Sequence, residues 1–441
     1  MTKSLNIAII GAGVAGLSAA WELTTAGHNV TIYEAGQEVG GLAAGFRDEG
    51  WDWALEKFYH HWFTTDSEVK KLAQEIGTWD KVSFPRPKTS YWIDGKLVRS
   101  EMSPSALFLP LSLLSTIRMA GTGAFLKLLP NGQFLEKYTA HEWLSRMMGE
   151  EAYGKFFRPL LIGKFGDKYQ SVNMAWMWAR IKTRSLNLGT YDGGFQTFLE
   201  DLADAVKKKG AKLHLNTPVE RIATPDGHPV LTINSETQSF DRVISTISPK
   251  LMLKLTDGLS DTDYGAKVGG LESMGAVVCI YALKQSLLTD GTYWLNLPAN
   301  SPDKSKSRFP FLALVEHTNW LPKSHYNDDV LIYAGDYVSP EHEYFQLSED
   351  ELAQRFMSVF ETINPDFKPE WVRKTWVFRA PYAQPLSGVN HSQNIPSLKT
   401  PLAGVYWASM SQVYPYDRGT NFAIEIGRRV AKIATAGGSG T

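Results

Sequence analysis

The sequence predicts an α/β fold built on a parallel sheet, and three observations in its first 34 residues predict it. Residues 5–10 are a short, Ile-rich apolar run, typical of a strand that is buried on both faces. Three glycines follow, and then a segment with helical periodicity over residues 14–26. A second apolar run over residues 29–33 ends at an acid, Glu34. This order of strand, glycine turn, helix and strand is that of a Rossmann-type dinucleotide-binding unit.

The glycine turn has the spacing that a bound pyrophosphate requires. Gly11 permits the tight turn, Gly13 lets the backbone approach the phosphates, and Gly16 lets the helix pack closely on the strand. Glu34 lies 23 positions after Gly11 (34 minus 11), where a carboxylate can accept hydrogen bonds from ribose hydroxyls. These residues predict a dinucleotide and leave open whether it is NAD or FAD.

Composition narrows the class of protein. The chain has 441 residues, enough for two or three domains, and a formal net charge of -1, which gives no reason to expect nucleic acid as a partner. A small-molecule partner is therefore expected. The single cysteine, Cys279, excludes an internal disulfide and a cysteine-based metal site, so we expect a reducing, cytoplasmic location and no metal.

Two apolar stretches could be mistaken for targeting or membrane segments. Residues 1–21 resemble a signal peptide, but cleavage there would destroy the glycine turn, so we interpret them as strand, turn and helix. Residues 103–130 are interrupted by Pro110, Arg118 and Lys127, so no uncharged stretch reaches the roughly 20 residues needed to cross a bilayer. This favours a buried or amphipathic helix pair. Contact of this stretch with a membrane surface remains an alternative.

A second glycine pair, Gly40-Gly41, follows Glu34, and from here the chain resembles the flavin-dependent amine oxidase superfamily, which includes monoamine oxidases, protoporphyrinogen oxidases and phytoene desaturases. Residues 193–196, 218–222, 240–246 and 404–408 are similar to further segments of that family. Near the C-terminus, residues 419–429 read as a helix whose N-terminus, in the family, points at the flavin. Unpaired N–H groups there would stabilise negative charge on a reduced flavin.

The resemblance implies FAD as the dinucleotide and a set of cofactor-binding residues. They are Gly11, Gly13, Ala15, Gly16, Glu34, Ala35, Gly40, Gly41, Leu42, Ala43, Val219, Ser409, Met410, Gly419, Thr420, Asn421 and Phe422. Two positions depart from the family pattern: Leu42 stands where an arginine is common, and Ser409-Met410 replaces a Gly-Asp or Gly-Glu pair. No cysteine follows Cys279, so non-covalent FAD is expected.

The resemblance also implies a discontinuous FAD-binding domain formed by residues 1–75, 190–270 and 395–435. A mixed α+β substrate-binding domain would be formed by residues 76–189 and 271–394, with a hairpin at residues 93–96. Strands are expected at residues 276–282 and 330–334, a helix near 348–362 and a surface loop over 300–307. Residues 436–441 are Gly- and Ser-rich, which predicts a flexible tail.

Four residues are candidates for catalysis, all near the flavin if the family geometry holds: Lys57, His60, Tyr414 and Tyr416. Either His60 or His61 could carry a proton or bind an anion, but neighbouring strand residues point to opposite faces. Asp417 could cap the helix that follows, and Arg418 could pair with a carboxylate. Each residue has a structural alternative.

Residues 156–184 are dense in aromatic and cationic side chains. They could form a cavity wall with cations at its rim, but we favour an aromatic helix core whose arginine side chains extend to solvent.

The predicted function is an FAD-dependent oxidoreductase that oxidises C–N or C–C bonds of a small, largely apolar substrate. Simple amine oxidation is disfavoured, because amine-oxidising relatives commonly place a lysine on a substrate-domain strand and residues 275–281 contain none. One alternative is a non-redox flavoenzyme resembling UDP-galactopyranose mutase. Another is a flavin-bearing structural or membrane-associated partner without turnover. The oligomeric state is open.

Overall fold

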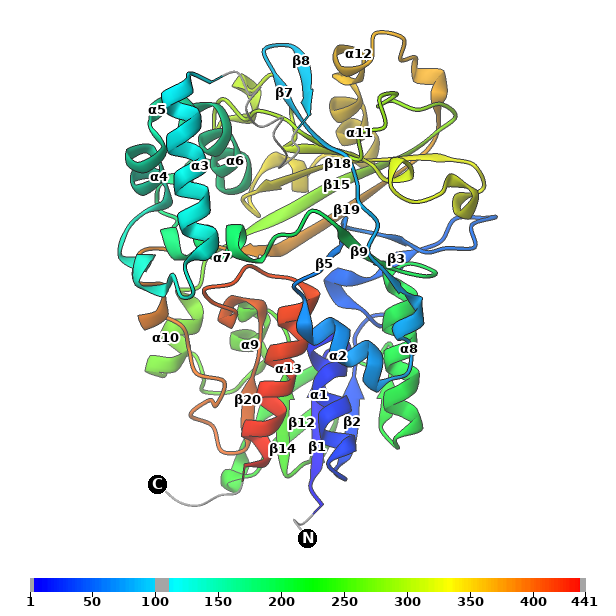
Figure 1. Ribbon diagram of the computed structural model, residues 1–441. Helices are drawn as coiled ribbons and strands as arrows, with labels where there is room; N and C mark the ends of the chain where they lie inside the picture. Colours follow the sequence, from blue (N-terminus) through cyan, green and yellow to red (C-terminus); the bar gives the residue numbers. More distant parts are fainter. Residues whose placement is uncertain (1–3, 100–110, 437–441) are drawn as a thin grey trace.

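The structure is a computed structural model that describes residues 4–99 and 111–436. Figure 1 shows two stacked parts: a lower part around a parallel sheet, where both chain ends lie, and an upper part around a larger sheet. The α/β fold class with a Rossmann-type unit and a second, mixed part is confirmed.

The lower part contains a five-stranded, fully parallel sheet. In spatial order its strands are β10 (Lys212–His214), β2 (Asn29–Tyr33), β1 (Asn6–Ile10), β14 (Arg242–Ser245) and β20 (Val405–Trp407). These strands come from segments that are far apart in the chain, and all fall within the three segments expected for the FAD domain. In β1 every residue after Asn6 is buried, as expected for a central strand.

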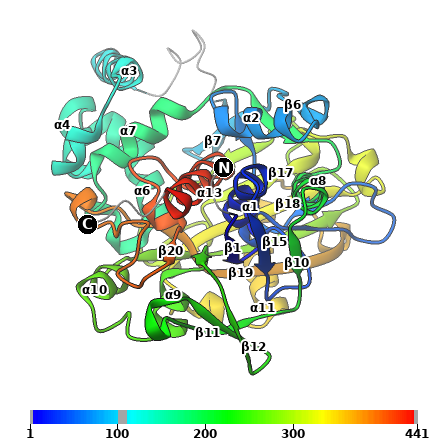
Figure 2. The same cartoon turned by 90° about the horizontal axis from the view of Figure 1, so that it is seen from below.

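Helices cover one face of this sheet and a small antiparallel sheet covers the other, as Figure 2 shows from below. The helices are α1 (Val14–Thr25), α2 (Ser67–Glu75), α8 (Phe195–Lys208) and α13 (Thr420–Thr435). The opposite face carries β11 (Val219–Ala223), β12 (Val230–Ile233), β13 (Glu236–Ser239), α9 (Pro249–Leu255) and α10 (Asp263–Gly269). Helices α1 and α13 pack closely, since a Cβ at Gly427 would lie 2.3 Å from the Ala15 carbonyl oxygen.

The upper part is built on a seven-stranded sheet. In spatial order its strands are β19 (Val372–Pro385), β15 (Ser273–Leu283), β18 (Val330–Val338), β17 (Ala313–Glu316), β16 (Trp294–Asn296), β7 (Thr89–Ile93) and β8 (Lys96–Arg99). Neighbours are antiparallel except β16 and β7. The predicted hairpin is confirmed: Ile93 pairs with Lys96, and Asp94 and Gly95 between them have φ of 50° and 80°. The predicted strands at 276–282 and 330–334 correspond to β15 and β18.

The remaining elements are helices and short strand pairs. The helices are α3 (Leu113–Leu128), α4 (Ala140–Met148), α5 (Glu150–Ala152), α6 (Arg158–Phe165), α7 (Met174–Thr183), α11 (Glu349–Met357) and α12 (Phe360–Ile363). Strand β3 (Gly45–Phe46) pairs with β4 (Leu55–Glu56), and β9 (Leu188–Tyr191) pairs with β5 (Trp62–Phe63) and β6 (Val82–Ser83). Within the described residues, no helix is both long and apolar enough to cross a membrane.

Three predictions of local structure need comment. The expected helix near 348–362 is two helices, α11 and α12, separated at Ser358 and Val359. The expected surface loop at 300–307 is wrong in one respect, because the Lys304 ammonium is buried 2.8 Å from a carboxylate oxygen of Asp336. Of the predicted helix pair at 103–130 the described part contains α3, while residues 103–110 and tail residues 437–441 lie outside the described ranges. The domain boundaries themselves stay a prediction.

Candidate cofactor and substrate site

The glycine turn joins β1 to α1 at the carboxyl edge of the parallel sheet. Gly11 has φ of 98°, and a Cβ there would lie 2.6 Å from the Thr246 hydroxyl oxygen. A Cβ at Gly16 would lie 2.0 Å from the Gly11 carbonyl oxygen, so a side chain would push α1 off the turn. A Cβ at Gly13 would meet one atom within 4 Å, the Gly40 carbonyl oxygen at 3.9 Å. Gly13 therefore holds space open beside its backbone.

The second glycine pair lies directly against this turn. The Gly40 N–H donates to the Ala12 carbonyl oxygen at 3.0 Å, and Gly40 forms a parallel bridge with Gly13. Gly40 and Gly41 have φ of 128° and 57°, in the region that favours glycine. A short helical turn, Gly41–Ala43, follows and places Leu42 half-buried beside the pair. We call Gly11 to Gly16 with Gly40 and Gly41 the glycine cradle.

Glu34 lies at the end of β2, next to the glycine cradle. One of its carboxylate oxygens accepts from the Ala12 N–H and the other from the Gly36 N–H, both at 2.7 Å. Each oxygen keeps a further lone pair with which it can accept from a ribose hydroxyl. The Thr217 N–H donates to the Glu34 carbonyl oxygen at 2.8 Å, which brings the start of β11, with buried Val219, to the same edge. Ala35, between Glu34 and Gly36, is exposed.

The N-terminus of α13 faces the same edge of the sheet (Figure 1). Two side chains of its first turn serve other elements: Thr420 accepts from the Trp62 indole N–H at 2.6 Å, and Asn421 accepts from the Glu68 and Val69 N–H groups at the start of α2. Gly419 precedes the helix in an extended conformation, and its carbonyl accepts the first helical bond, from Ala423 at 2.9 Å. The backbone N–H groups before Ala423 are therefore the donors that α13 can offer to a ligand.

The loop between β20 and α13 is fixed from within. Ser409 donates its backbone N–H to the Gln412 side chain at 2.8 Å, and its own side chain completes a reciprocal capping pair with Gln412. Tyr382 shares a hydrogen bond of 2.7 Å with the Ser411 hydroxyl. Met410 begins the short helical turn of this loop. The pair that departs from the family pattern is thus held by side chains of the protein itself.

These features fit a dinucleotide. The glycine cradle gives close backbone approach at the N-terminus of α1, Glu34 stands where the ribose would lie, and α13 points a second helix N-terminus at the same edge. Cofactor binding by individual residues stays a prediction.

A pocket adjoins the glycine cradle and extends to the seven-stranded sheet. It is lined by Leu42, Phe58, Tyr59, His60, Ala276, Val278, Asp336, Tyr337, Ala383 and Arg418. Because Leu42 follows the second glycine pair, this pocket lies between the cofactor side and β15, β18 and β19. Most of the lining is apolar or aromatic, and the charged groups are Asp336 and Arg418. Asp336 is neutralised by Lys304.

His60 lines the pocket, whereas its neighbour His61 is not among the lining residues. The His60 Nδ1 contacts the Phe58 carbonyl oxygen, and burial together with the charge of Arg418 lowers the pKa of His60 to about 4. Burial lowers the pKa of His61 to about 3, with the nearby Arg184 adding to the effect. Both histidines are therefore neutral at pH 7, and His60 can exchange a proton or donate a hydrogen bond only as a neutral imidazole.

The other candidate catalytic residues are held by partners in the structure. The Lys57 ammonium lies 2.5 Å from a carboxylate oxygen of Glu38, beside the glycine cradle. The Tyr414 hydroxyl donates to Glu136 at 2.9 Å. Tyr416 stacks on Phe422 with ring centroids 4.8 Å apart, at the start of α13. None of these three lines the pocket, and their catalytic roles stay predictions.

A buried cluster of charge lies behind Arg418. Its centre is Asp417, whose carboxylate accepts from the Arg180 guanidinium at 2.7 Å and lies 3.6 Å from the Lys164 ammonium. Burial alone would raise the pKa of Asp417, but Lys164, Arg180 and Arg418 together hold it well below its ordinary value. The suggestion that Asp417 caps α13 is wrong, since Gly419 occupies that position and this carboxylate faces α6 and α7. The favoured interpretation of residues 156–184 is confirmed for the aromatic core, since Phe165 and Trp176 are buried. It is wrong for Arg180, which pairs with Asp417 and whose side chain is only 15% exposed.

Sequence reasoning missed several residues of this site. Asp336, Tyr337 and Gln384 were not singled out, although Tyr337 and Gln384 both accept from the Arg418 guanidinium. Tyr337 lies on β18 and Gln384 on β19, and nothing in the local sequence brings these strands to Arg418. Alternation along the strands was the one available signal, because it marks which residues of β18 and β19 share a face.

The fold and the glycine cradle define a protein with a Rossmann-type dinucleotide-binding fold. The chain belongs to the flavin containing amine oxidoreductase family, whose model matches residues 14–434. The family that the sequence resembles is therefore confirmed.

Individual relatives share shorter or more distant similarity. A 15-cis-phytoene desaturase of Glycine max is 40% identical over 82 residues, 19% of this chain and 14% of that protein. The mitochondrial protoporphyrinogen oxidase of Nicotiana tabacum is 26% identical over 185 residues, 39% of this chain and 35% of that protein. The chain thus matches well under two thirds of the length of either. Reduced UDP-galactopyranose mutase has the same fold, with a TM-score of 0.75, 17% identity and coverage of 97% of this chain and 95% of that one.

Proposed function

We propose that this chain binds FAD non-covalently and oxidises a C–N or C–C bond of a small substrate held in the pocket beside Leu42. The observation that carries the proposal is the glycine cradle, in which Gly13 keeps space open between two backbone segments at the N-terminus of α1. Glu34 favours a free ribose 2′-hydroxyl, because its carboxylate would repel a 2′-phosphate. Dehydrogenation fits the names of the desaturase and oxidase relatives.

The roles of the chain's own residues follow from their positions. The cradle and the N-terminus of α1 would hold the pyrophosphate, and backbone N–H groups of α13 would stabilise negative charge at the flavin ring. Tyr59 and Phe58 would exclude water from the pocket. Neutral His60 would orient the substrate. The flavin, when bound, supplies the hydride-accepting chemistry.

The reaction class is tested by anaerobic mixing of the purified protein with amines, porphyrinogens and polyenes. We expect at least one class to bleach the flavin absorbance and to yield a product two hydrogens poorer. Full retention of colour with every class would contradict the oxidoreductase proposal for these substrates.

The state of the cofactor gives a separate prediction. The purified protein should be yellow, and acid or heat denaturation should release the whole of its flavin into the supernatant, because no cysteine lies near α13 to form a covalent link. Chromatography of the supernatant should identify FAD rather than FMN. Flavin that stays with the precipitated protein would contradict non-covalent binding.

A second candidate is a non-redox flavoenzyme resembling UDP-galactopyranose mutase. The buried cations behind Arg418 favour it, because a diphosphate needs positive charge. Binding of a UDP-sugar to the reduced protein and not to the oxidised one would support this candidate over the first.

We also propose cytoplasmic location with peripheral contact to a lipid surface through α3. Its outer side exposes Leu113 (74%), Leu114 (68%), Ile117 (60%), Phe125 (47%) and Leu128 (78%). These side chains recur at helical spacing and form one apolar strip on a surface helix, a pattern typical of interfacial helices.

Replacing Leu114 with lysine should weaken binding to phosphatidylcholine vesicles about tenfold, because burial of one leucine contributes roughly 1.5–3 kcal/mol. Vesicle co-sedimentation measures this. Leu251→Lys on α9 is the matched control, since Leu251 is also an exposed leucine (44%) on a surface helix. Equal sedimentation of both variants would contradict the contact.

A further inference from the structure

Three cations converge beside the pocket on a single carboxylate. Lys164 lies on α6, Arg180 on α7 and Arg418 just before α13, and all three face Asp417. Asp417 already has four donors: one oxygen accepts from Trp176, Gln384 and the Arg418 backbone N–H, and the other accepts from Arg180. The cluster therefore contains more positive than negative charge.

Two of these cations have N–H groups without a hydrogen-bond acceptor among the described residues. The Lys164 ammonium lies over the rings of Tyr337 (4.8 Å) and Trp176 (5.7 Å), and within the described ranges no acceptor comes within hydrogen-bond distance of it. The Arg418 guanidinium donates from Nε to the Gln384 side-chain oxygen at 3.0 Å, and one N–H of Nη2 donates to the Tyr337 hydroxyl. Its remaining N–H groups, those of Nη1 among them, carry no hydrogen bond to the described residues, and Arg418 lines the pocket.

Unpaired positive charge inside a protein is costly, because water no longer solvates it. Burial, followed by the charge of Arg180, holds the pKa of Lys164 well below its ordinary value. The second carboxylate near the pocket, Asp336, does not relieve this, since it is paired with Lys304. An anion that entered from the pocket would supply the missing negative charge and accept from the free N–H groups.

We infer that the substrate carries a compact anionic group, a carboxylate or a phosphate, which binds Arg418 with Lys164 behind it, while the apolar body of the substrate lies against Leu42, Phe58 and Val278. This inference rests on the proposed function, since it places the substrate in the same pocket. It changes the expected substrate from a largely apolar molecule to an amphiphilic one. A planar guanidinium with paired N–H groups is suited to the two oxygens of such an anion.

The test uses the flavin-loaded protein and small probes. Benzoate should bind, as measured by calorimetry and by perturbation of the flavin spectrum, and neutral benzamide of the same shape should bind about 10- to 100-fold more weakly. Arg418→Met and Lys164→Met should each lose a similar factor for benzoate and keep their flavin. Arg158→Met is the matched control on α6, because Arg158 pairs with an exposed Glu150. Binding of inorganic pyrophosphate to the same variants tests whether the anionic group is a phosphate rather than a carboxylate.

Three results distinguish the anion site from its alternatives. Equal binding of benzoate and benzamide, or benzoate and pyrophosphate binding unchanged in both Met variants, would overturn the inference. If Arg418→Met alters the flavin's reduction potential and leaves benzoate affinity unchanged, the cations serve the flavin, and the inference is again overturned. If benzoate binds as expected and no substrate class bleaches the flavin, the inference stands and the proposed oxidation fails.

Discussion

Replacing Gly13 with alanine is expected to weaken flavin binding strongly while leaving the flavin-free protein as stable as the natural one. The backbone of Gly13 has φ of -72° and ψ of 177°, which alanine adopts without strain, and the added Cβ would meet one atom at 3.9 Å. The same Cβ would fill the space that the glycine cradle keeps open. Losing two charge-assisted contacts to phosphate should weaken flavin binding about 100-fold or more.

Flavin content per protein, read from the visible spectrum after reconstitution with FAD, measures the effect. Urea unfolding of the flavin-free protein measures stability. Gly121→Ala on α3 is the control: a Cβ there has nothing within 4 Å, so flavin content should stay normal and stability should rise by up to about 1 kcal/mol. Full flavin content in Gly13→Ala would show that the phosphates do not lie in the cradle.

Those parts of the fold that depend on neighbours in sequence could be predicted. The strand expected at 29–33 is β2, and the helix expected at 14–26 is α1, which ends at Thr25. The hairpin at Ile93 to Lys96 was predictable because Asp-Gly determines its own turn. The break between α11 and α12 was not, since residues 348–362 keep helical composition and packing decides where the helix ends.

The charged site could not be predicted, because its geometry depends on contacts between distant segments. Arg180 and Asp417 are 237 positions apart and lie 2.7 Å from each other. The hydroxyl of Tyr414 reaches Glu136, 278 positions away. From sequence alone, a long cationic side chain is predicted to face solvent, because most such side chains do. Only a partner from a distant segment explains why one is buried instead. The fold class could therefore be predicted from the sequence, and the arrangement of the buried charges could not.

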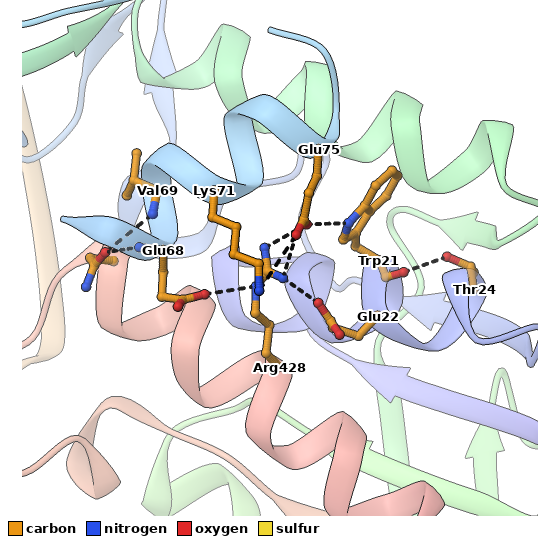
Figure 3. A network of polar contacts seen from close by, with 9 residues as sticks. Trp21, Glu22, Thr24, Glu68, Val69, Lys71, Glu75 and Arg428 are labelled. Carbon is orange, nitrogen blue, oxygen red and sulfur yellow. Dashed lines mark hydrogen bonds and ion pairs between the residues drawn. The ribbon is translucent and has the colours of Figure 1, made fainter. Parts of the chain in front are cut away.

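Replacing Arg428 with methionine is expected to lower the free energy of unfolding by about 3 kcal/mol, the lower end of the range for breaking a buried pair. Figure 3 shows Arg428 on α13 between carboxylates of α1 and α2. Its guanidinium lies 2.5 Å from Glu22, 3.2 Å from Glu68 and 2.8 Å from Glu75, and its side chain is 7% exposed. The variant would leave three carboxylates facing each other.

Denaturant unfolding at several pH values distinguishes charge from packing. Burial by itself would raise the pKa of Glu75, but hydrogen bonds from Arg428 and Trp21 hold this pKa below its ordinary value in the folded protein. A carboxyl with a lowered pKa stabilises the fold above its unfolded pKa and loses this contribution as pH falls through its folded pKa. The deficit of Arg428→Met should therefore be largest at pH 7 and shrink below about pH 4.5. Lys71→Met, which removes an exposed pair at 3.9 Å, should change stability by less than about 0.5 kcal/mol at either pH. A deficit of Arg428→Met that stays constant from pH 7 to pH 4 would mean that side-chain packing, and not the three carboxylates, makes Arg428 stabilising.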